Sequence, residues 1–184
     1  MADRSKERLL DEYLVASART GDRKAFELLA RRWGRKLLAH AWRLTGDVDL
    51  ARDAAQEGWV EIMRGLGRLR EERAFPAWAY QVVTRRCARQ VGQVVRRRAL
   101  DAAVLAEGHP IHAEAETADP NEPERLRQAL SKLPQEQRTA IALFHLEDMS
   151  IAETAVALNV PAGTVKTRLM HARRKLRAAL EGER

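Results

Sequence analysis

Cysteine, aromatic side chains and long apolar runs are all scarce in this sequence of 184 residues. Cys87 is the single cysteine, which excludes a disulfide framework and a cysteine-based zinc site and favours a packing role for its side chain. Aromatic residues make up only 5% of the chain, and no apolar run approaches the length of a membrane span. Because the N-terminus also has no signal-peptide pattern, the sequence predicts a cytoplasmic protein.

Basic residues and helix-forming residues are abundant instead. The formal net charge is +7 and the calculated pI is about 10.2, which favours a polyanionic partner. The helix formers predict an all-α fold. Residues 99–124 differ from the rest, with seven acidic residues, three prolines and no lysine or arginine. This composition predicts a flexible acidic linker between two small basic helical domains, residues 1–98 and 125–184.

The segment from Ser150 to Arg177 has the pattern of a helix-turn-helix. Ser150 and Glu153 have the spacing of a capping box, which predicts that a helix begins at Ser150. Asn159 tolerates the left-handed conformation that ends helices, and Pro161 suits the first turn of the next one. In that second helix we expect four apolar residues to face the core, namely Val165, Leu169, Ala172 and Leu176.

The remaining faces of the second helix are basic. Six lysines and arginines and no acidic residue lie between Pro161 and Arg177. A solvated helix face normally carries charges of both signs, so this pattern favours insertion into the major groove of DNA. The candidate DNA contacts are Thr164, Lys166, Thr167, Arg168, His171, Arg174 and Lys175.

The N-terminal domain shows four helical patterns. The first stops at Thr20-Gly21, the second at Thr45-Gly46 and the third near residues 65–67; the fourth starts at Phe75 and runs to about residue 97. We expect their periodic apolar residues to form the core: Leu9, Leu10, Tyr13, Leu14 and Ala16; Phe26, Leu29, Ala30, Trp33, Leu37, Ala41 and Leu44; Ala51, Ala54, Ala55, Trp59, Ile62 and Met63; and Phe75, Trp78, Val82 and Val83.

The fourth predicted helix carries a second basic stretch. Residues 84–98 contain six arginines and no acid, and a polar loop at residues 68–73 precedes this helix. Basic side chains beside loop or aromatic pockets are typical of surfaces that hold single-stranded nucleic acid. A solvated arginine face explains this segment equally well when it is considered alone.

These motifs together resemble the extracytoplasmic-function sigma factors of bacterial RNA polymerase. Gly21-Asp22 with Ala25-Phe26, residues 53–59 (DAAQEGW) and residues 75–78 (FPAW) are similar to domain two of that family. Residues 133–138 (LPQEQR) and 160–168 (VPAGTVKTR) are similar to its domain four. The resemblance covers about residues 20–98 and 124–178, with the motifs in the family's order.

The resemblance implies a role for each segment. Asp53, Gln56 and Glu57 match positions that bind the clamp helices of the largest polymerase subunit, and domain four also contacts the flap of the second-largest subunit. The helix-turn-helix would read the minus-thirty-five element. The loop and the fourth helix would recognise and open the minus-ten element, through Arg68, Arg70, Arg73, Trp78, Arg85, Arg86 and Arg89. Gly58 departs from the family pattern, which usually has a larger residue there.

Other functions remain open at this stage. A helix-turn-helix regulator that acts without core polymerase would share the C-terminal motif. His109, His112, Glu114 and Glu116 could ligate a metal, although their spacing matches no helical histidine-pair motif. The sequence shows no catalytic motif and no cofactor site, so we expect no enzymatic activity. Members of the family that this sequence resembles are commonly held inactive by an anti-sigma factor. The resemblance therefore implies an anti-sigma factor as a possible partner.

Overall fold

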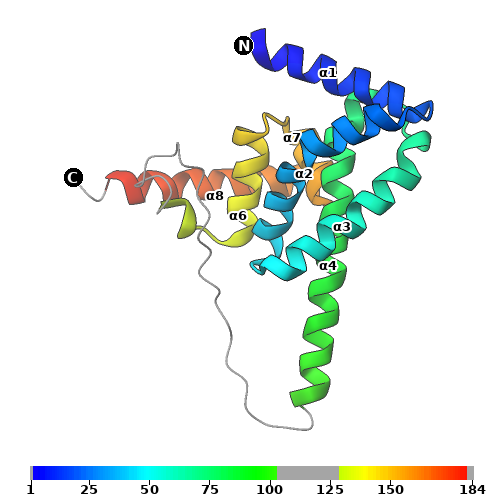
Figure 1. Ribbon diagram of the computed structural model, residues 1–184. Helices are drawn as coiled ribbons and strands as arrows, with labels where there is room; N and C mark the ends of the chain where they lie inside the picture. Colours follow the sequence, from blue (N-terminus) through cyan, green and yellow to red (C-terminus); the bar gives the residue numbers. More distant parts are fainter. Residues whose placement is uncertain (1, 103–128, 182–184) are drawn as a thin grey trace.

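The computed structural model describes residues 2–102 and 129–181, and every regular element in these ranges is a helix. The N-terminal domain (residues 2–102) contains α1 (Ala2–Arg19), α2 (Arg23–Thr45), α3 (Val48–Gly65) and α4 (Phe75–Ala102). Two 3-10 turns, η1 (Leu66–Arg68) and η2 (Glu72–Ala74), connect α3 to α4. The C-terminal domain (residues 129–181) contains α6 (Gln135–Ile141), α7 (Ile151–Leu158) and α8 (Ala162–Glu181), with a π-helical turn η3 (Ala142–Leu146) after α6. The predicted all-α fold is confirmed (Figure 1).

Local signals set most of the helix ends. The Asp22 carboxylate accepts hydrogen bonds from two amides in the first turn of α2, and Asp47 does the same for α3. Gly46 ends α2 in the left-handed conformation, with a φ of 68°. The α4 helix continues to Ala102, past the start of the predicted linker at residue 99, and most of that linker lies outside the described residues.

The predicted helix-turn-helix is confirmed in its details. The Ser150 side chain accepts from the Glu153 amide, and the Glu153 carboxylate accepts from the Ser150 amide at 2.7 Å, which completes the capping box. Asn159 is left-handed at the end of α7, with a φ of 54°. The Pro161 carbonyl accepts the first hydrogen bonds of α8, and Val165, Leu169 and Ala172 are buried as expected.

The core of the N-terminal domain lies between α2, α3 and α4. Trp33 packs edge to face against Phe75 and Tyr80, with ring centroids 5.4 and 5.8 Å apart. Gly58 lies where α3 closely approaches α4: a Cβ atom built at this position would stand 2.9 Å from the Val83 Cγ2 atom. The close contact between these helices therefore explains the glycine that departs from the family pattern.

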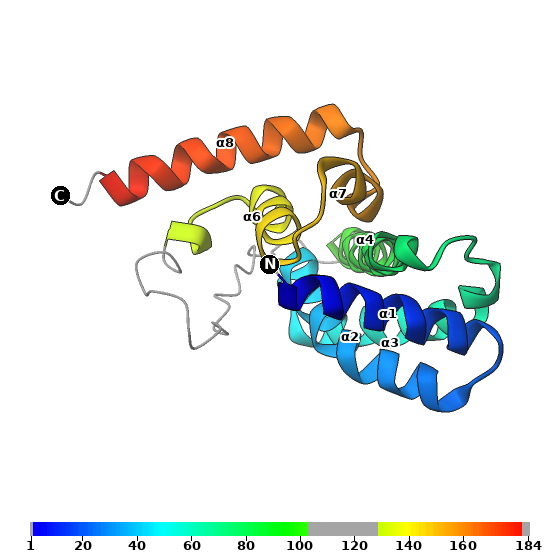
Figure 2. The same ribbon diagram turned by 90° about the horizontal axis from the view of Figure 1, so that it is seen from above.

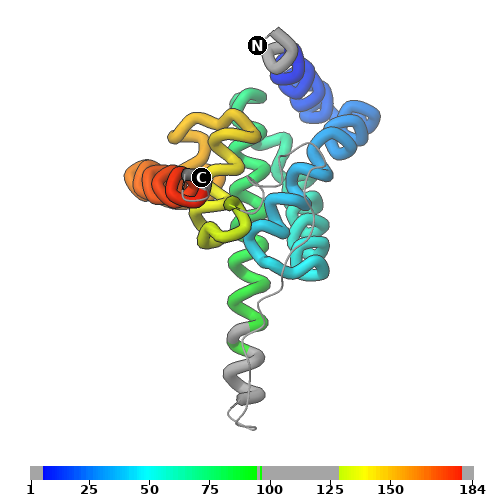
Figure 3. Tube along the Cα trace, turned by 90° about the vertical axis from the view of Figure 1, so that its left-hand side faces the viewer, coloured from blue at the N-terminus to red at the C-terminus, as the bar shows by residue number. Residues whose placement is uncertain are grey.

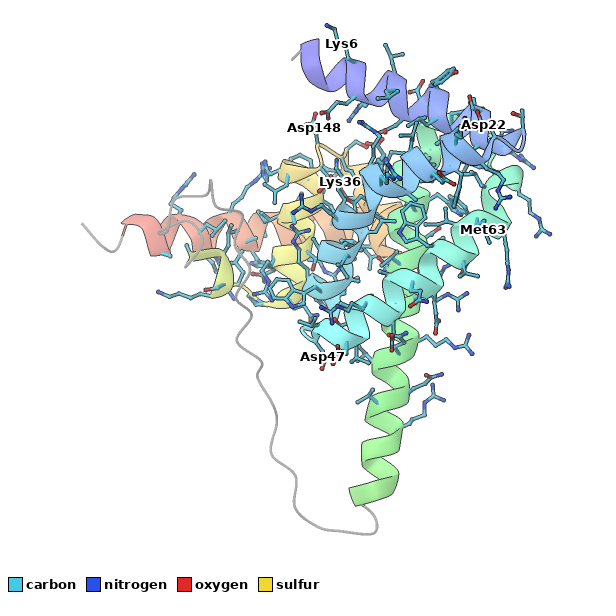
Figure 4. The ribbon with its side chains drawn as sticks, viewed as in Figure 1. Lys6, Asp22, Lys36, Asp47, Met63 and Asp148 are labelled. Carbon is cyan, nitrogen blue, oxygen red and sulfur yellow. The ribbon has the colours of Figure 1, made fainter. Side chains whose placement is uncertain are left out.

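Two parts of the predicted core are wrong. Leu9, Leu10, Tyr13 and Ala16 of α1 are exposed, whereas Leu14 and Val15 of this helix are buried. Leu14 and Val15 pack into the core together with Ala18, so the covered side of α1 is not the side that carries Leu9, Tyr13 and Ala16; Figure 1 also shows the N-terminal end of this helix projecting away from the other helices. Met63, in the last part of α3, is also exposed, at 57% of its maximum (Figure 4).

The two domains pack against each other. The α7 helix lies against α4, and α6 lies against α2, so one cluster of buried apolar residues continues from the N-terminal into the C-terminal domain. The views from above and from the side both show the C-terminal helices on one side of α2 and α4 (Figures 2 and 3). The sequence predicted two domains joined by a linker, and it did not predict this contact.

The described part of the chain was searched for membrane-spanning helices and for groups of metal ligands. Within residues 2–102 and 129–181, no helix combines the length and apolar character needed to cross a membrane. No cluster of three or more potential metal ligands occurs in these ranges. The candidate ligands His109, His112, Glu114 and Glu116 lie outside the described residues.

Candidate nucleic-acid and polymerase-binding surfaces

The α8 helix lies on the side of the C-terminal domain away from the N-terminal helices (Figure 2), and it carries several exposed basic residues. Lys166, Thr167, Arg174 and Lys175 are exposed, whereas Thr164 and His171 are half-buried. A shallow groove of about 380 Å³ follows this face and is lined by Lys166, Met170, Arg173, Arg174 and Arg177. Met170, Arg173 and Arg177 were not among the candidate DNA contacts; the helical periodicity that places them off the apolar side of α8 is the sequence signal that could have identified them.

Arg168 differs from the other basic residues of α8. Its guanidinium donates to the Glu136 carboxylate of α6 at 2.7 Å, and its side chain is only 20% exposed. The geometry therefore gives Arg168 a role in joining α8 to α6. The Thr167 hydroxyl donates to the Gly163 carbonyl of its own helix, so its methyl group remains available to a ligand.

The candidates for the minus-ten element lie in two groups. Arg68, Arg70 and Arg73 are exposed on the connection between α3 and α4, which contains η1 and η2. The Arg73 side chain pairs with the Glu71 carboxylate at 2.7 Å. Trp78 is half-buried, and its ring packs near Phe75 at the start of α4 and near Gly65 at the end of α3. The second group, Arg85, Arg86 and Arg89, lies further along α4.

Glu61 of α3 holds two of the α4 arginines, a role that the sequence did not indicate. One oxygen of its carboxylate accepts from Arg85 at 2.8 Å, and the other accepts from Arg86 Nε at 2.8 Å and Nη2 at 2.5 Å. A third donor of Arg86 lies 3.2 Å from Glu57. The hydrogen bonding between Arg86 and the Glu61 carboxylate raises the pKa of the Arg86 guanidinium. The positive charge of these two arginines is therefore largely neutralised by α3.

The α3 helix presents a mixed acidic and apolar face. Asp53, Gln56 and Glu57 are all exposed and follow the spacing of one helix face. Val60 and Met63 continue the same face and are 40% and 57% exposed. Exposed apolar side chains beside hydrogen-bonding groups are typical of a protein-binding surface. Periodicity alone could not identify Met63, because it also fits the buried side of the pattern.

Comparison with known proteins shows what kind of chain carries these surfaces. Residues 29–102 match the family model for sigma-70 region 2, and residues 124–176 match the model for sigma-70 region 4. The sigma-H factor of Pseudomonas aeruginosa is 31% identical over 183 residues, which cover 93% of this chain and 94% of that protein. The extracytoplasmic-function sigma factor SigM of Mycobacterium tuberculosis is 34% identical, over 90% of this chain and 82% of that protein.

The chain belongs to the extracytoplasmic-function sigma factors. It therefore directs RNA polymerase to specific promoters, and its partners are core RNA polymerase and promoter DNA. The alternative of a regulator that acts without core polymerase is not favoured, because residues 29–102 match a sigma domain that such a regulator does not need.

Solved structures support the fold of this sigma factor. The structure of CnrH in complex with the cytosolic domain of CnrY is 25% identical, with a TM-score of 0.62, and the match covers 95% of this chain and 99% of CnrH. The sigma factor RpoE of Bartonella quintana, solved with the anti-sigma factor NepR, is 23% identical with a TM-score of 0.66, over 88% of this chain and 99% of that chain. The second likeness concerns the fold alone.

Proposed function

We propose that this sigma factor divides promoter recognition and polymerase binding among three separate surfaces. The α8 face reads the minus-thirty-five element, and the η1–η2 connection with the exposed arginines of α4 binds the minus-ten element. The α3 face formed by Asp53, Gln56, Glu57, Val60 and Met63 binds the clamp helices of the largest polymerase subunit. The observation that carries the proposal is the contrast between the basic α8 groove and the acidic and apolar α3 face.

The charges support this division. A surface hollow lined by lysine and arginine attracts phosphates, and counterions are released when it binds DNA. The α3 face combines two carboxylates with apolar side chains, so it would repel DNA and suit a cationic protein surface. The protein would act in the cytoplasm, without a catalytic activity of its own, through the polymerase that it directs. An anti-sigma factor is a further proposed partner, since both neighbouring structures were solved with another protein bound.

Two pairs of substitutions test the division. We expect Asp53→Ala with Gln56→Ala to weaken binding to purified core RNA polymerase and to leave the affinity for duplex DNA unchanged. Lys166→Ala with Arg174→Ala should have the opposite effect and lower the salt dependence of duplex binding by about two ions. Core binding is measured by fluorescence anisotropy of labelled protein, and DNA binding by titration of a labelled duplex at several salt concentrations. Loss of core binding in the α8 variant, or of duplex binding in the α3 variant, would contradict the assignment.

A further inference from the structure

The end of α1 lies beside the η1–η2 connection, residues 66–74, to which we assign binding of the minus-ten element (Figures 1 and 2). The backbone bonds of this connection are local: the Leu69 amide donates to the Leu66 carbonyl, and the Ala74 amide donates to the Glu71 carbonyl, both at 3.1 Å. Such bonds shape each short turn but do not fix the direction of the whole connection. Its placement therefore depends on contacts with other elements.

Arg19, the last residue of α1, makes one of these contacts. Its guanidinium donates to the carboxylate of Glu72 in η2. The two side chains are only 27% and 35% exposed, so water and salt screen this ion pair less than they screen the mostly exposed pair of Glu71 with Arg73. The pair that joins the connection to α1 is consequently stronger than the pair within the connection.

The backbone at Arg19 is fixed from both sides. Leu14 and Val15, about one turn before it, are buried in the core of the N-terminal domain. After it the chain turns tightly into α2, and the Gly21 amide donates back to a carbonyl of α1 at 3.1 Å. Arg19 can therefore hold Glu72 at one place relative to the core.

A second residue of α1 acts on the connection through its charge. The pKa of Arg73 is raised, mainly by its hydrogen bond with Glu71 and to a smaller extent by the negative charge of Glu12. Glu12 and Arg19 are seven positions apart, or about two helical turns, so they lie on the same side of α1. This side of α1 faces the connection.

The pair with Arg19 also keeps the Glu72 carboxylate away from the arginines of the connection. Arg68 and Arg70 are exposed, and neither has a carboxylate partner in the described part of the chain. A Glu72 side chain without its own partner would compete with phosphates for these two cations. With Glu72 held by α1, both arginines remain available to nucleic acid.

We propose that Arg19 is a positioning residue for promoter opening: its ion pair with Glu72 holds the η1–η2 connection in the placement from which its arginines bind the unpaired strand. A connection that moves freely would have to be ordered each time it bound, at a cost in conformational entropy, whereas a fixed connection has already lost that freedom. The role in opening rests on the proposed function. The attachment of the connection to α1 does not.

Amide hydrogen exchange of the free full-length protein tests the attachment. Arg19→Gln and Glu72→Gln should each accelerate exchange in peptides covering residues 66–74 by about three- to fivefold, with unchanged exchange in the rest of the domain, because the connection opens more often. Arg32→Gln is the matched control, since Arg32 pairs with Asp11 of α1 at 2.8 Å and a similar exposure but lies on α2. Unchanged exchange in both test variants, or equal acceleration by Arg32→Gln, would overturn the proposal.

Permanganate, which oxidises unpaired thymines, tests the role in opening. Core polymerase is incubated with each variant and a promoter fragment on which the wild-type protein directs transcription. Charge alone predicts opposite effects, since Arg19→Gln removes a positive charge and Glu72→Gln removes a negative one. A positioning role predicts instead that both variants lower the permanganate reactivity of the minus-ten element by about three- to fivefold and leave core binding unchanged, as does Arg32→Gln for both readouts.

Reversal of the pair distinguishes positioning from the loss of one side chain. Arg19→Glu combined with Glu72→Arg should restore permanganate reactivity to within about twofold of the wild type, because the two new side chains can pair again. Opposite or absent effects of the single substitutions, or no recovery in the reversed pair, would contradict the positioning role. If the wild-type protein directs no transcription with active core polymerase, the proposed function fails and the role in opening fails with it, whereas the attachment is still decided by hydrogen exchange.

Discussion

At the scale of single residues, the structure changes the meaning of the α4 arginines. The sequence grouped Arg85, Arg86 and Arg89 as nucleic-acid contacts because no acid lies near them in the chain. The acid comes from another helix: Glu61 is far away in sequence and lies against two of the three arginines. Patterns within one helix could predict that the residues are basic, but not that α3 neutralises two of them.

Glu61 should restrain the nucleic-acid affinity of α4. We expect Glu61→Gln to strengthen binding to a labelled single-stranded 30-mer of thymidine nucleotides and to steepen its salt dependence by about one to two ions, because Arg85 and Arg86 are released. Anisotropy titrations from low to moderate salt measure both effects. Glu27→Gln is the control, since Glu27 is exposed and its substitution changes the net charge equally. Equal effects of the two substitutions would show that Glu61 does not restrain the arginines.

His40 should make the stability of the protein depend on pH. Its pKa is about 3 in the folded protein and 6.5 in the unfolded chain, so below pH 6.5 only the unfolded chain gains the proton. The free energy of unfolding should therefore lose about 2 kcal/mol through this group between pH 7 and pH 5, and nothing above pH 7. Urea denaturation of the wild type and of His40→Gln at both pH values measures this contribution. The same pH dependence in both proteins would contradict it.

At the scale of helices, sequence patterns predicted most ends and many buried faces. The capping box at Ser150, the left-handed Asn159 and the stop at Gly46 are local signals, and all three are confirmed. The predicted α1 face was wrong because the spacing of apolar residues in this helix fits more than one side, and only the packing of the domain determines that the side with Leu14 and Val15 is covered. The Gly58 contact was also invisible, because it depends on how closely α3 and α4 approach.

Two glycine substitutions separate helix propensity from helix packing. Gly34→Ala should raise the free energy of unfolding by about 0.5–1 kcal/mol, because nothing lies within 4 Å of the added Cβ atom. Gly58→Ala gains the same propensity but presses on the buried Val83, so we expect a net loss of about 1 kcal/mol. Urea denaturation of both variants gives the two values. A Gly58→Ala protein as stable as Gly34→Ala would show that α3 and α4 can move apart freely.

At the scale of the whole molecule, the sequence predicted two basic helical domains and their family. The motifs were sufficient for this because each one is local. The packing of α7 on α4 depends on groups more than 70 positions apart, such as the Thr84 hydroxyl and the backbone carbonyl of Ala157, and no pattern within either domain predicts it. The packing of the C-terminal domain on α2 and α4 is consequently the main feature of the molecule that the sequence did not predict.

Promoter-specific initiation is the central claim, and in vitro transcription measures it most directly. Purified core RNA polymerase is incubated with fragmented genomic DNA, with and without the protein, and transcript start sites are mapped by sequencing. The account predicts new start sites that appear only with the protein and share two upstream motifs at a fixed spacing. These start sites should disappear with Asp53→Ala combined with Gln56→Ala. Start sites unchanged by adding the protein, in the presence of active core polymerase, would contradict the account.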